Sequence, residues 1–534
     1  MQRESPGPSV LTVLTFTAIL AIAGASVATS AAAADEPLQI TLLFTNDVES
    51  AYDPIPAFWI EGLERIGGIA EMTTLIEELR ASEPNVFLFD AGDIFTGALA
   101  KQTEGRLAFE LMITMGYDAM AIGNHEFEYG HEVFAWQKNR APFPVLGANL
   151  FYRGTDHPYA QAHAVIERDG VRIGVVGIMG QDTVSAIIPS YIAPLDVRDP
   201  VTHVQRSIDE LRDEVDLVVL LTHQGKTAPM QTDAESDPRL QRDIDADMRL
   251  AGALDGVDVL LAGHADAGTP EPVVHPVTGT IIMQTYGQAT HLGYLRVRLS
   301  ADGDIASYDG RLIAVDPDRY AADERILAKL EAYRSAHPEL MEPVGRLEAA
   351  LVRRYIEESD VGNLVADALL EASGADIAFV HAGSLRKDLP AGNVRRVDVL
   401  DTYPFVDDVI VKAITGAQLG RIIEQSLTLE RGLLQFAGLR LVYDLSRPEG
   451  ERIVSLEHDG KPVTVTDEFR VAAPSFLAEG GDLYTAFAES PPLESVGETA
   501  AVVMQYLREQ GTVARPSRGR QQAIADARNG EKEE

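Results

Sequence analysis

Five short apolar runs in the first half of the chain are each followed closely by polar residues. The runs cover residues 40–44, 86–89, 119–122, 217–221 and 257–261, and each has the length and composition of a buried strand. Helical spacing at residues 69–81 and 105–115 separates some of them. Strands that alternate with helices predict a layered α/β domain between about Leu38 and Arg311. Further strand-like runs predict a second α/β domain, at residues 377–381, 409–414, 439–443 and 470–473.

The polar residues after the first five runs are of the kinds that bind metal ions. They are Asn46-Asp47-Val48-Glu49, Gly92-Asp93, Gly123-Asn124-His125-Glu126, His223 and Gly263-His264-Ala265-Asp266. One such Asp is usually a turn residue, and one such His is usually a hydrogen-bonded loop residue. The order of all five is informative, because strands that end at one sheet edge deliver their loops to one crevice. Carboxylates, amides and imidazoles suit divalent ions that clamp a phosphoryl group and activate water.

This series resembles the calcineurin-like metallophosphoesterases, and most closely the secreted 5'-nucleotidase branch. The resemblance covers roughly residues 38–505 and implies a two-sheet sandwich flanked by helices, followed by a substrate-binding α/β domain. We expect a signal peptide at residues 1–34, a catalytic domain at 35–312 and a linker helix at 313–343. The substrate-binding domain is expected at 344–510 and a disordered tail at 511–534.

The resemblance also implies two metal sites that share one residue. Asp93 would bridge both ions, and Asn124, His223 and His264 would complete the second site. The first site would contain Asp47, Glu49 and Asp266 besides Asp93. Glu49 stands where the family has His, and Asp266 stands where it has His, Gln or Asn.

The first set would therefore consist of carboxylates only. Such a set favours a hard ion such as Mn²⁺, Mg²⁺ or Ca²⁺, whereas Mn, Zn or Fe suits the His-containing second set. Both departures from the family pattern, Glu49 and Asp266, are residues that can bind a metal ion, and both belong to the first site. This favours a first site that is altered but still binds its ion. The alternative is a decayed first site, which would leave a one-metal or non-catalytic nucleotide- or metal-binding relative.

In the family, the His after the Asn ligand acts on the phosphoryl group. That position is His125 here, which we expect to stabilise developing charge or to protonate the leaving oxygen. The family's Asp that steadies this His is replaced by Glu128, one methylene longer.

The second domain carries the residues that the resemblance assigns to the substrate. Motifs at 357–367, 434–447 and 479–482 match the nucleotidase substrate domain. Arg386 would hold the phosphate or ribose side, with His381 opening its motif and either Arg353 or Arg354 near a second basic position. Tyr484 and Phe436 would stack on a nucleobase, although core packing is an equally plausible role for both rings.

Composition limits the partners of the protein. The 534 residues carry a formal net charge of −37, which disfavours polynucleotides and anionic membranes. Residues 1–34 combine an apolar run with Ala-x-Ala near Ala34, which predicts export to the periplasm or outside the cell without a membrane anchor. There is no cysteine, so neither a disulfide nor a lipidated cysteine can form. The sequence does not indicate an oligomeric state.

The sequence thus predicts an exported dinuclear-metal phosphohydrolase that acts on a small phosphoester, in the first place nucleoside 5'-monophosphates. A nucleotide-sugar pyrophosphatase and a 2',3'-cyclic phosphodiesterase on the same scaffold are the enzyme alternatives. A thiosulfohydrolase of sulfur oxidation shares the fold, but no carrier-protein interface is evident in the sequence.

Overall fold

The computed structural model describes residues 38–233 and 240–524. The predicted signal peptide at 1–34 lies outside these residues. None of the helices in the described ranges combines the length and apolar character needed to span a bilayer.

A six-stranded mixed sheet forms one layer of the first part of the chain. Its strand order is β16-β15-β1-β4-β5-β6. The strands are β1 (Leu38–Thr45), β4 (Val86–Asp90), β5 (Ala119–Ala121), β6 (Val145–Leu146), β15 (His291–Leu299) and β16 (Ile305–Ala314). Strands β1, β4, β5 and β6 run parallel, while β15 and β16 are antiparallel to their neighbours. The parallel strands therefore end at one edge.

A second six-stranded sheet has the order β13-β14-β12-β11-β9-β8. Its strands are β8 (His163–Arg168), β9 (Val171–Met179), β11 (Leu217–Gln224), β12 (Val259–His264), β13 (Val273–Val274) and β14 (Ile281–Gln284). Strands β9, β11, β12 and β14 are parallel. Phe87 and Phe89 of the first sheet share one buried cluster with Val175 and Val219 of the second. The two sheets therefore pack face to face, as predicted.

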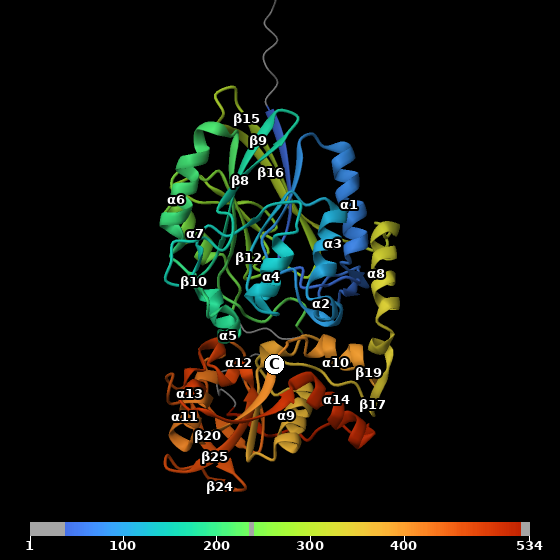
Figure 1. Cartoon of the computed structure of the whole chain (residues 1–534), viewed down its shortest axis with the longest axis vertical. Coiled ribbons are helices and arrows are strands. Elements are labelled where there is room, and N and C mark those ends of the chain that lie inside the picture. The colour runs from blue at the N-terminus through green and yellow to red at the C-terminus, as the bar shows by residue number, and fades with distance from the viewer. Residues whose placement is uncertain (1–37, 234–239, 525–534) are drawn as a thin grey trace, which may run out of the picture. The chain divides into compact units, whose positions relative to one another are not determined.

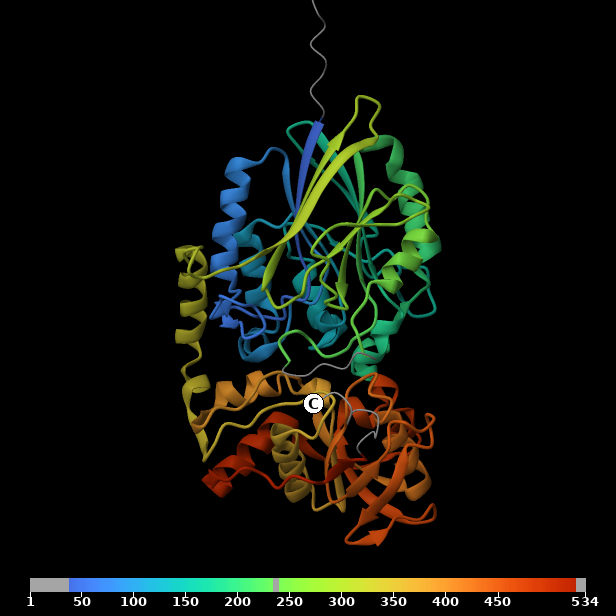
Figure 2. The same cartoon turned by 180° about the vertical axis from the view of Figure 1, so that it is seen from behind.

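Helices cover the outer face of each sheet (Figures 1 and 2). Helices α1 (Ile69–Ser82) and α3 (Arg106–Met115) pack against the first sheet, and α6 (Pro200–Leu211) and α7 (Asp245–Gly252) pack against the second. The start of α6 follows from its sequence, because the Asp199 carboxylate accepts a hydrogen bond from Val201 N and Pro200 occupies the first turn. Burial of strands on both faces explains why their sequences are continuously apolar.

The predicted linker contains helix α8 (Glu324–Ala336). Its buried residues Ile326 and Leu330 join the cluster that contains α1 and α3. The Tyr333 hydroxyl donates to Glu110 of α3 at 2.8 Å. The helix is therefore packed along the first part of the chain and is not a free-standing connection.

The C-terminal part contains a five-stranded sheet of order β21-β18-β25-β20-β26. The strands are β18 (Ile377–Val380), β20 (Asp408–Thr415), β21 (Gln435–Ala437), β25 (Glu468–Pro474) and β26 (Pro492–Glu498). The main helices are α9 (Asp360–Ser373), α11 (Gly416–Ser426) and α14 (Thr499–Gln510). Ser359 caps α9, and Thr415 with Gln418 forms a capping box at the start of α11.

Shorter elements complete the two parts. The helices are α2 (Gly97–Thr103), α4 (His131–Lys138), α5 (Pro189–Ile192), α10 (Arg396–Thr402), α12 (Ser475–Ala478) and α13 (Thr485–Ala488). The strands are β2 (Ile55–Pro56), β3 (Arg65–Ile66), β7 (Leu150–Tyr152), β10 (Leu195–Val197), β17 (Pro343–Leu347), β19 (Gly392–Arg395), β22 (Arg440–Tyr443), β23 (Ile453–His458) and β24 (Lys461–Pro462).

The expectation of a disordered tail from residue 511 is wrong for residues 511–524. Strand β27 (Thr512–Val513) pairs with β17, and β28 (Gln521–Ala523) pairs with β22. Arg520 holds this segment in place by donating to Asp367 at 2.7 Å and to the Phe436 carbonyl at 3.0 Å. The segment is polar in sequence because its contacts are ion pairs and backbone bonds. Residues 525–534 lie outside the described ranges.

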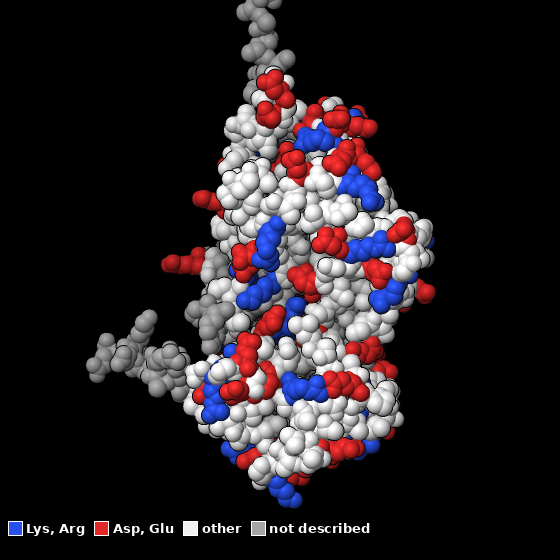
Figure 3. Space-filling model, turned by 90° about the vertical axis from the view of Figure 1, so that its left-hand side faces the viewer, with Lys and Arg blue, Asp and Glu red and all other residues white. Residues whose placement is uncertain are grey.

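Acidic and basic side chains are interspersed on the face shown in Figure 3. The net negative charge of the chain is therefore spread over this face and does not form one acidic patch there.

Candidate active site and metal centre

The predicted metal ligands lie at the carboxyl ends of five parallel strands. Asp47, Asp93 and Asn124 follow β1, β4 and β5, respectively. His223 and His264 differ from the sequence-based expectation, because they lie within the last two residues of β11 and β12 and not beyond them. These two strands pair in parallel with His223 opposite Gly263, so the two imidazoles come from neighbouring strand ends.

Asp93, His223 and His264 form a buried group whose ligand atoms all lie within 4.8 Å of one another. His223 Nε2 is 2.9 Å from Asp93 Oδ2 and 3.2 Å from Asn124 Oδ1. His223 Nδ1 lies 2.8 Å from the Ala91 carbonyl, so it carries the proton and leaves Nε2 to face the group. His264 Nε2 is buried without a hydrogen-bond partner. These four residues fit a divalent metal ion.

Burial also affects the proton affinity of this group. It lowers the pKa of His264 well below its ordinary value, and the neighbouring His223 adds to this effect. A neutral imidazole is the form that binds metal. Burial likewise raises the pKa of Asp47 to about 6.

The backbone of the candidate ligands is strained. Positive φ angles between 45° and 71° occur at Asp47, Glu49, Asp93, His264 and Asp266. Residues other than glycine adopt this left-handed region at a cost, and such residues cluster at functional sites. The strain supports a functional role for these loops.

Two glycines allow the strand ends to approach closely. A Cβ at Gly123 would lie 2.2 Å from Asp93 Oδ1, and a Cβ at Gly92 would lie 2.8 Å from His223 Nδ1. Gly92 also has a φ of +97°. The glycines of the Gly-Asp and Gly-Asn motifs are therefore required by the packing around Asp93.

Glu126 holds Asp93 in position, a role that the sequence did not reveal. Its carboxylate is fully buried and accepts hydrogen bonds from Asp93 N and Ile94 N at 2.9 Å each, and from Gly123 N at 2.6 Å. It thereby joins the loop after β4 to the loop after β5. The motif Gly123-Asn124-His125-Glu126 indicated that Glu126 lies near the site. The motif alone does not say which groups the Glu126 carboxylate contacts.

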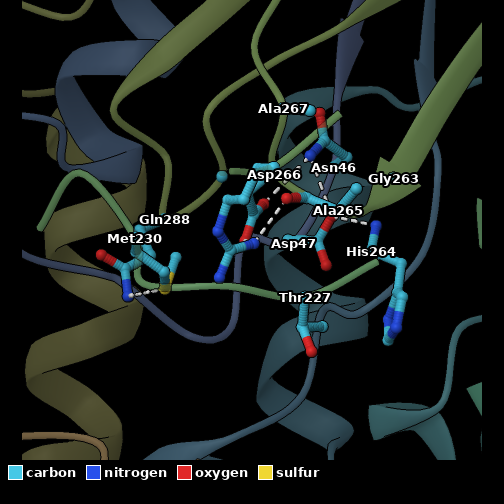
Figure 4. Close-up of polar contacts among 12 residues, drawn as sticks. Asn46, Asp47, Thr227, Met230, Gly263, His264, Ala265, Asp266, Ala267 and Gln288 are labelled. Atoms are coloured by element: carbon cyan, nitrogen blue, oxygen red, sulfur yellow. Dashed lines mark hydrogen bonds and ion pairs between the residues drawn. The ribbon is translucent and has the colours of Figure 1, made fainter. Parts of the chain in front are cut away.

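The predicted first-metal carboxylates are arranged differently from the His-containing set. Asn46 Nδ2 donates to Asp47 Oδ2 at 2.8 Å and to Asp266 Oδ1 at 3.3 Å, and Figure 4 shows these three side chains turned toward one another. Asp266 is also paired with Arg242 at 3.2 Å, and Glu49 with Arg386. Among the described residues, no three of these carboxylates have oxygens that all lie within 4.8 Å of one another.

The two sets open into one cavity whose lining comes from both parts of the chain. Arg242 and Asp233 belong to the first part, and Arg353, Arg386 and Arg431 to the C-terminal part. Arg353 pairs with Asp233 at 2.6 Å across the cavity. Phe405, Phe476 and Tyr355 supply aromatic surface. A cavity that is rich in arginine beside a metal centre is suited to an anionic phosphoester.

Comparison with known proteins agrees with this geometry. Residues 40–265 match the calcineurin-like phosphoesterases, and residues 342–489 match the 5'-nucleotidase C-terminal domain. The chain is 27% identical to a 5'-nucleotidase of Vibrio parahaemolyticus over 88% of its own length and 89% of that protein. It is 26% identical to a snake venom 5'-nucleotidase of Gloydius brevicauda, over 97% and 93% of the two chains.

A solved structure is also similar to most of the chain. The crystal structure of a 5'-nucleotidase precursor from Thermus thermophilus has a TM-score of 0.79 and 26% identity, and the match covers 92% of this chain and 100% of that one. The chain belongs to the 5'-nucleotidase family. It is a metal-dependent phosphoesterase with a metallophosphoesterase sandwich and a 5'-nucleotidase C-terminal domain.

In this nucleotidase-family chain, His125 lies in a short 3₁₀ turn (His125–Phe127) directly after Asn124. Its Nδ1 is 2.5 Å from Glu128 Oε1, which also accepts from the Thr96 hydroxyl. Its Nε2 lies 3.3 Å from Glu49 Oε1 and 3.9 Å from Asp93 Oδ2. Burial works against protonation, but the carboxylates of Asp93 and Glu128 raise the pKa of His125 to about 9.

Among the predicted substrate residues, His381 and Arg386 line the cavity. Tyr484 and Phe436 do not: each is 1% exposed and belongs to the C-terminal hydrophobic core. Phe436 lies in β21 and packs edge-on against Phe379, with ring centroids 5.9 Å apart. The expected base-stacking role is therefore corrected to core packing for both rings.

The structure distinguishes the two arginines near the second basic position. Arg353, and not Arg354, lines the cavity. Arg431 was missed, since it lies just before the motif at 434–447. It donates to the Thr227 and Ser185 hydroxyls at 3.2 Å each, so it links the two parts of the chain. Phe405 was also missed, and its ring lies 6.2 Å from that of His125.

Proposed function

We propose that the chain hydrolyses nucleoside 5'-monophosphates to nucleoside and phosphate. The observation that carries this proposal is the buried group of Asp93, His223 and His264, which opens into the same cavity as Arg386 of the C-terminal part. Relatives named 5'-nucleotidase match most of the chain, which supports a nucleotide as the phosphoester. Mn, Zn or Fe is the proposed ion at this set, because two imidazoles accompany two oxygen ligands.

The proposed roles follow from contacts in the cavity. A divalent ion held by the His-containing set supplies polarisation of the phosphate and activation of water when it is bound. Arginine side chains in the cavity bind the phosphate oxygens through charge-assisted hydrogen bonds. His125 holds a proton at Nε2 and donates it to the leaving oxygen, while Glu128 accepts from Nδ1 and fixes the ring.

A nucleotide-sugar pyrophosphatase or a 2',3'-cyclic phosphodiesterase is the second candidate. The burial of Tyr484 and Phe436 supports keeping it, because neither ring is available to clamp a base and the group beyond the phosphate is less restricted. Both alternatives use the same metal centre and the same arginines.

We also propose export and the domain limits expected above, with residues 35–312 as the catalytic domain, 313–343 as the linker and 344–510 as the substrate-binding domain. Export rests on the sequence of residues 1–34. N-terminal sequencing of the exported protein should begin near Asp35. An intact Met1 on an active, unexported protein would contradict this proposal.

The activity is tested by a hydrolysis screen of the purified chain. Phosphate release is measured from the four common nucleoside 5'-monophosphates. For a nucleoside diphosphate sugar and a 2',3'-cyclic nucleotide, product formation is followed by chromatography, because cleavage of these two substrates yields phosphomonoesters and not free phosphate. Each reaction is run with Mn²⁺, Mg²⁺, Ca²⁺, Zn²⁺ or Fe²⁺. We expect the highest kcat/KM for a 5'-monophosphate. Cleavage confined to the pyrophosphate or the cyclic diester would replace this proposal with the corresponding alternative, and the absence of cleavage with every ion would refute it.

A further inference from the structure

We infer that this chain holds one resident metal ion, and that the guanidinium groups of Arg242 and Arg386 take the place of the second ion that the family resemblance implies. The inference rests on the proposed function for its chemistry, since the same cavity would bind the phosphate. The number of bound ions is nevertheless measurable without any substrate.

The first observation concerns Asp266. Arg242 Nη1 lies 3.2 Å from Asp266 Oδ2 and donates to the Ala265 carbonyl at 2.5 Å. Its Nε donates to the Pro229 carbonyl at 3.3 Å. Only 13% of the Arg242 side chain is exposed. The guanidinium is therefore fixed beside the carboxylate and is not a loose surface partner.

The second observation concerns Glu49. Its Oε1 is paired with Arg386 Nη2 and also lies 3.3 Å from His125 Nε2. The Glu49 side chain is 8% exposed. One of the two carboxylate oxygens of Glu49 is therefore already in contact with two nitrogen donors, one of which comes from the C-terminal part of the chain.

One of the two carboxylate oxygens of Asp47 already accepts hydrogen bonds from the protein. Its Oδ2 accepts from Asn46 Nδ2 and from His264 N, both at 2.8 Å. Its other oxygen remains for an ion, but one carboxylate oxygen and the shared Asp93 make a poor site without Glu49 and Asp266. In contrast, His264 of the other set keeps a buried, unpartnered Nε2.

The charges support the same conclusion. The two sets together contain four buried or nearly buried carboxylates, Asp47, Glu49, Asp93 and Asp266. The guanidinium groups of Arg242 and Arg386 place two positive charges directly against two of these carboxylates, Asp266 and Glu49. Buried charges are stable only when they are paired, and here the arginines provide the pairing.

A guanidinium can perform part of the role of the missing ion. Its planar fork donates two parallel hydrogen bonds to phosphate oxygens, and it stays charged at every physiological pH. The two changes from the family pattern, Glu49 and Asp266, are the two residues that pair with Arg242 and Arg386. Carboxylates suit these arginine partners, because the opposite charges pair in the buried cavity.

The test is a count of bound Mn²⁺ in the purified full chain, by elemental analysis after dialysis and by titration calorimetry. We expect one equivalent per chain in the wild type. In Arg242→Met, which keeps the aliphatic stem without the charge, a second equivalent should bind at least tenfold more tightly than to the wild type. Arg353→Met is the matched control, because Arg353 pairs with Asp233 in the same cavity outside both sets. It should still bind one equivalent.

Two tight equivalents in the wild type would overturn the inference, as would a single equivalent in Arg242→Met or a second one in Arg353→Met. The wild-type count decides even if a variant fails to fold. One bound ion without hydrolysis of any phosphoester would leave the inference standing and refute the proposed function. No bound ion would overturn both.

Discussion

Replacing Glu126 by Gln should weaken the metal centre, although Glu126 is neither a predicted ligand nor part of the cavity lining. Its fully buried carboxylate accepts from the backbone N–H groups of Asp93, Ile94 and Gly123. Two of these bonds go to one oxygen and the third goes to the other. The Gln side chain has nearly the same shape but only one acceptor oxygen.

The expected magnitude follows from these bonds. If the Gln oxygen keeps the N–H groups of Asp93 and Gly123, its amide nitrogen faces the N–H of Ile94, and that donor is left buried without an acceptor. An unsatisfied buried donor costs about 1–3 kcal/mol, and the two remaining bonds lose the assistance of the charge. We therefore expect the free energy of unfolding to fall by about 2–4 kcal/mol. Metal affinity should fall by about 10–100-fold, as when a partner that orients a ligand is lost.

Chemical unfolding followed by circular dichroism measures the first quantity, and Mn²⁺ titration calorimetry measures the second. Glu61→Gln is the control, because it makes the same chemical change at an exposed loop position. It should alter stability by less than about 0.5 kcal/mol. Wild-type metal affinity in Glu126→Gln, even with reduced stability, would refute the idea that this carboxylate positions Asp93.

Three further predictions concern single residues. Asp93→Asn should remove most bound metal and nearly all hydrolysis while circular dichroism stays unchanged, and retained metal would contradict its place in the ligand set. His125→Ala should keep the bound ion and lower kcat by about 10²–10⁴-fold, since it acts on charge and not on coordination; loss of the ion would show that the assigned role is wrong. Burial raises the pKa of Asp407 from 3.8 to about 6, so its contribution to stability is present below pH 4 and is lost as the pH rises through 6. Relative to the wild type, the free energy of unfolding of Asp407→Asn should therefore rise by about 3 kcal/mol between pH 4 and pH 7, as measured by chemical unfolding. If the stability difference between the variant and the wild type is the same at both pH values, this reasoning is contradicted.

The position of the metal centre could be predicted because it depends on local sequence. Each ligand of the His-containing set lies at or just after an apolar run, and parallel strands bring their carboxyl ends to one edge. This argument brings His223 and His264 together within the second sheet, and the face-to-face packing of the two sheets, which the family resemblance implied, adds Asp93 from the first sheet. The two-sheet sandwich followed from the same runs and from the family resemblance.

The substrate side could not be predicted in the same way. Tyr484 and Phe436 have the right place in the motif, but whether a ring faces a cavity or a core depends on neighbours distant in sequence, such as Phe379 for Phe436. A motif gives the position of a residue along the chain and not the direction of its side chain. The polar segment at 511–524 was misjudged for a related reason, since the strands and acidic groups that it pairs with lie far away in the chain.

Arg242 illustrates the same limit inside the metal centre. It follows no strand and belongs to no motif, yet its guanidinium lies against Asp266 in the set where the family pattern is altered. From the sequence, Glu49 and Asp266 read as two more oxygen ligands, because carboxylates bind hard ions well. The structure adds that each of them faces an arginine, and a carboxylate that neutralises a buried guanidinium has less charge to offer an ion. Ligand chemistry alone therefore does not decide the number of ions; the cations that reach the same carboxylates from elsewhere in the chain must be counted as well.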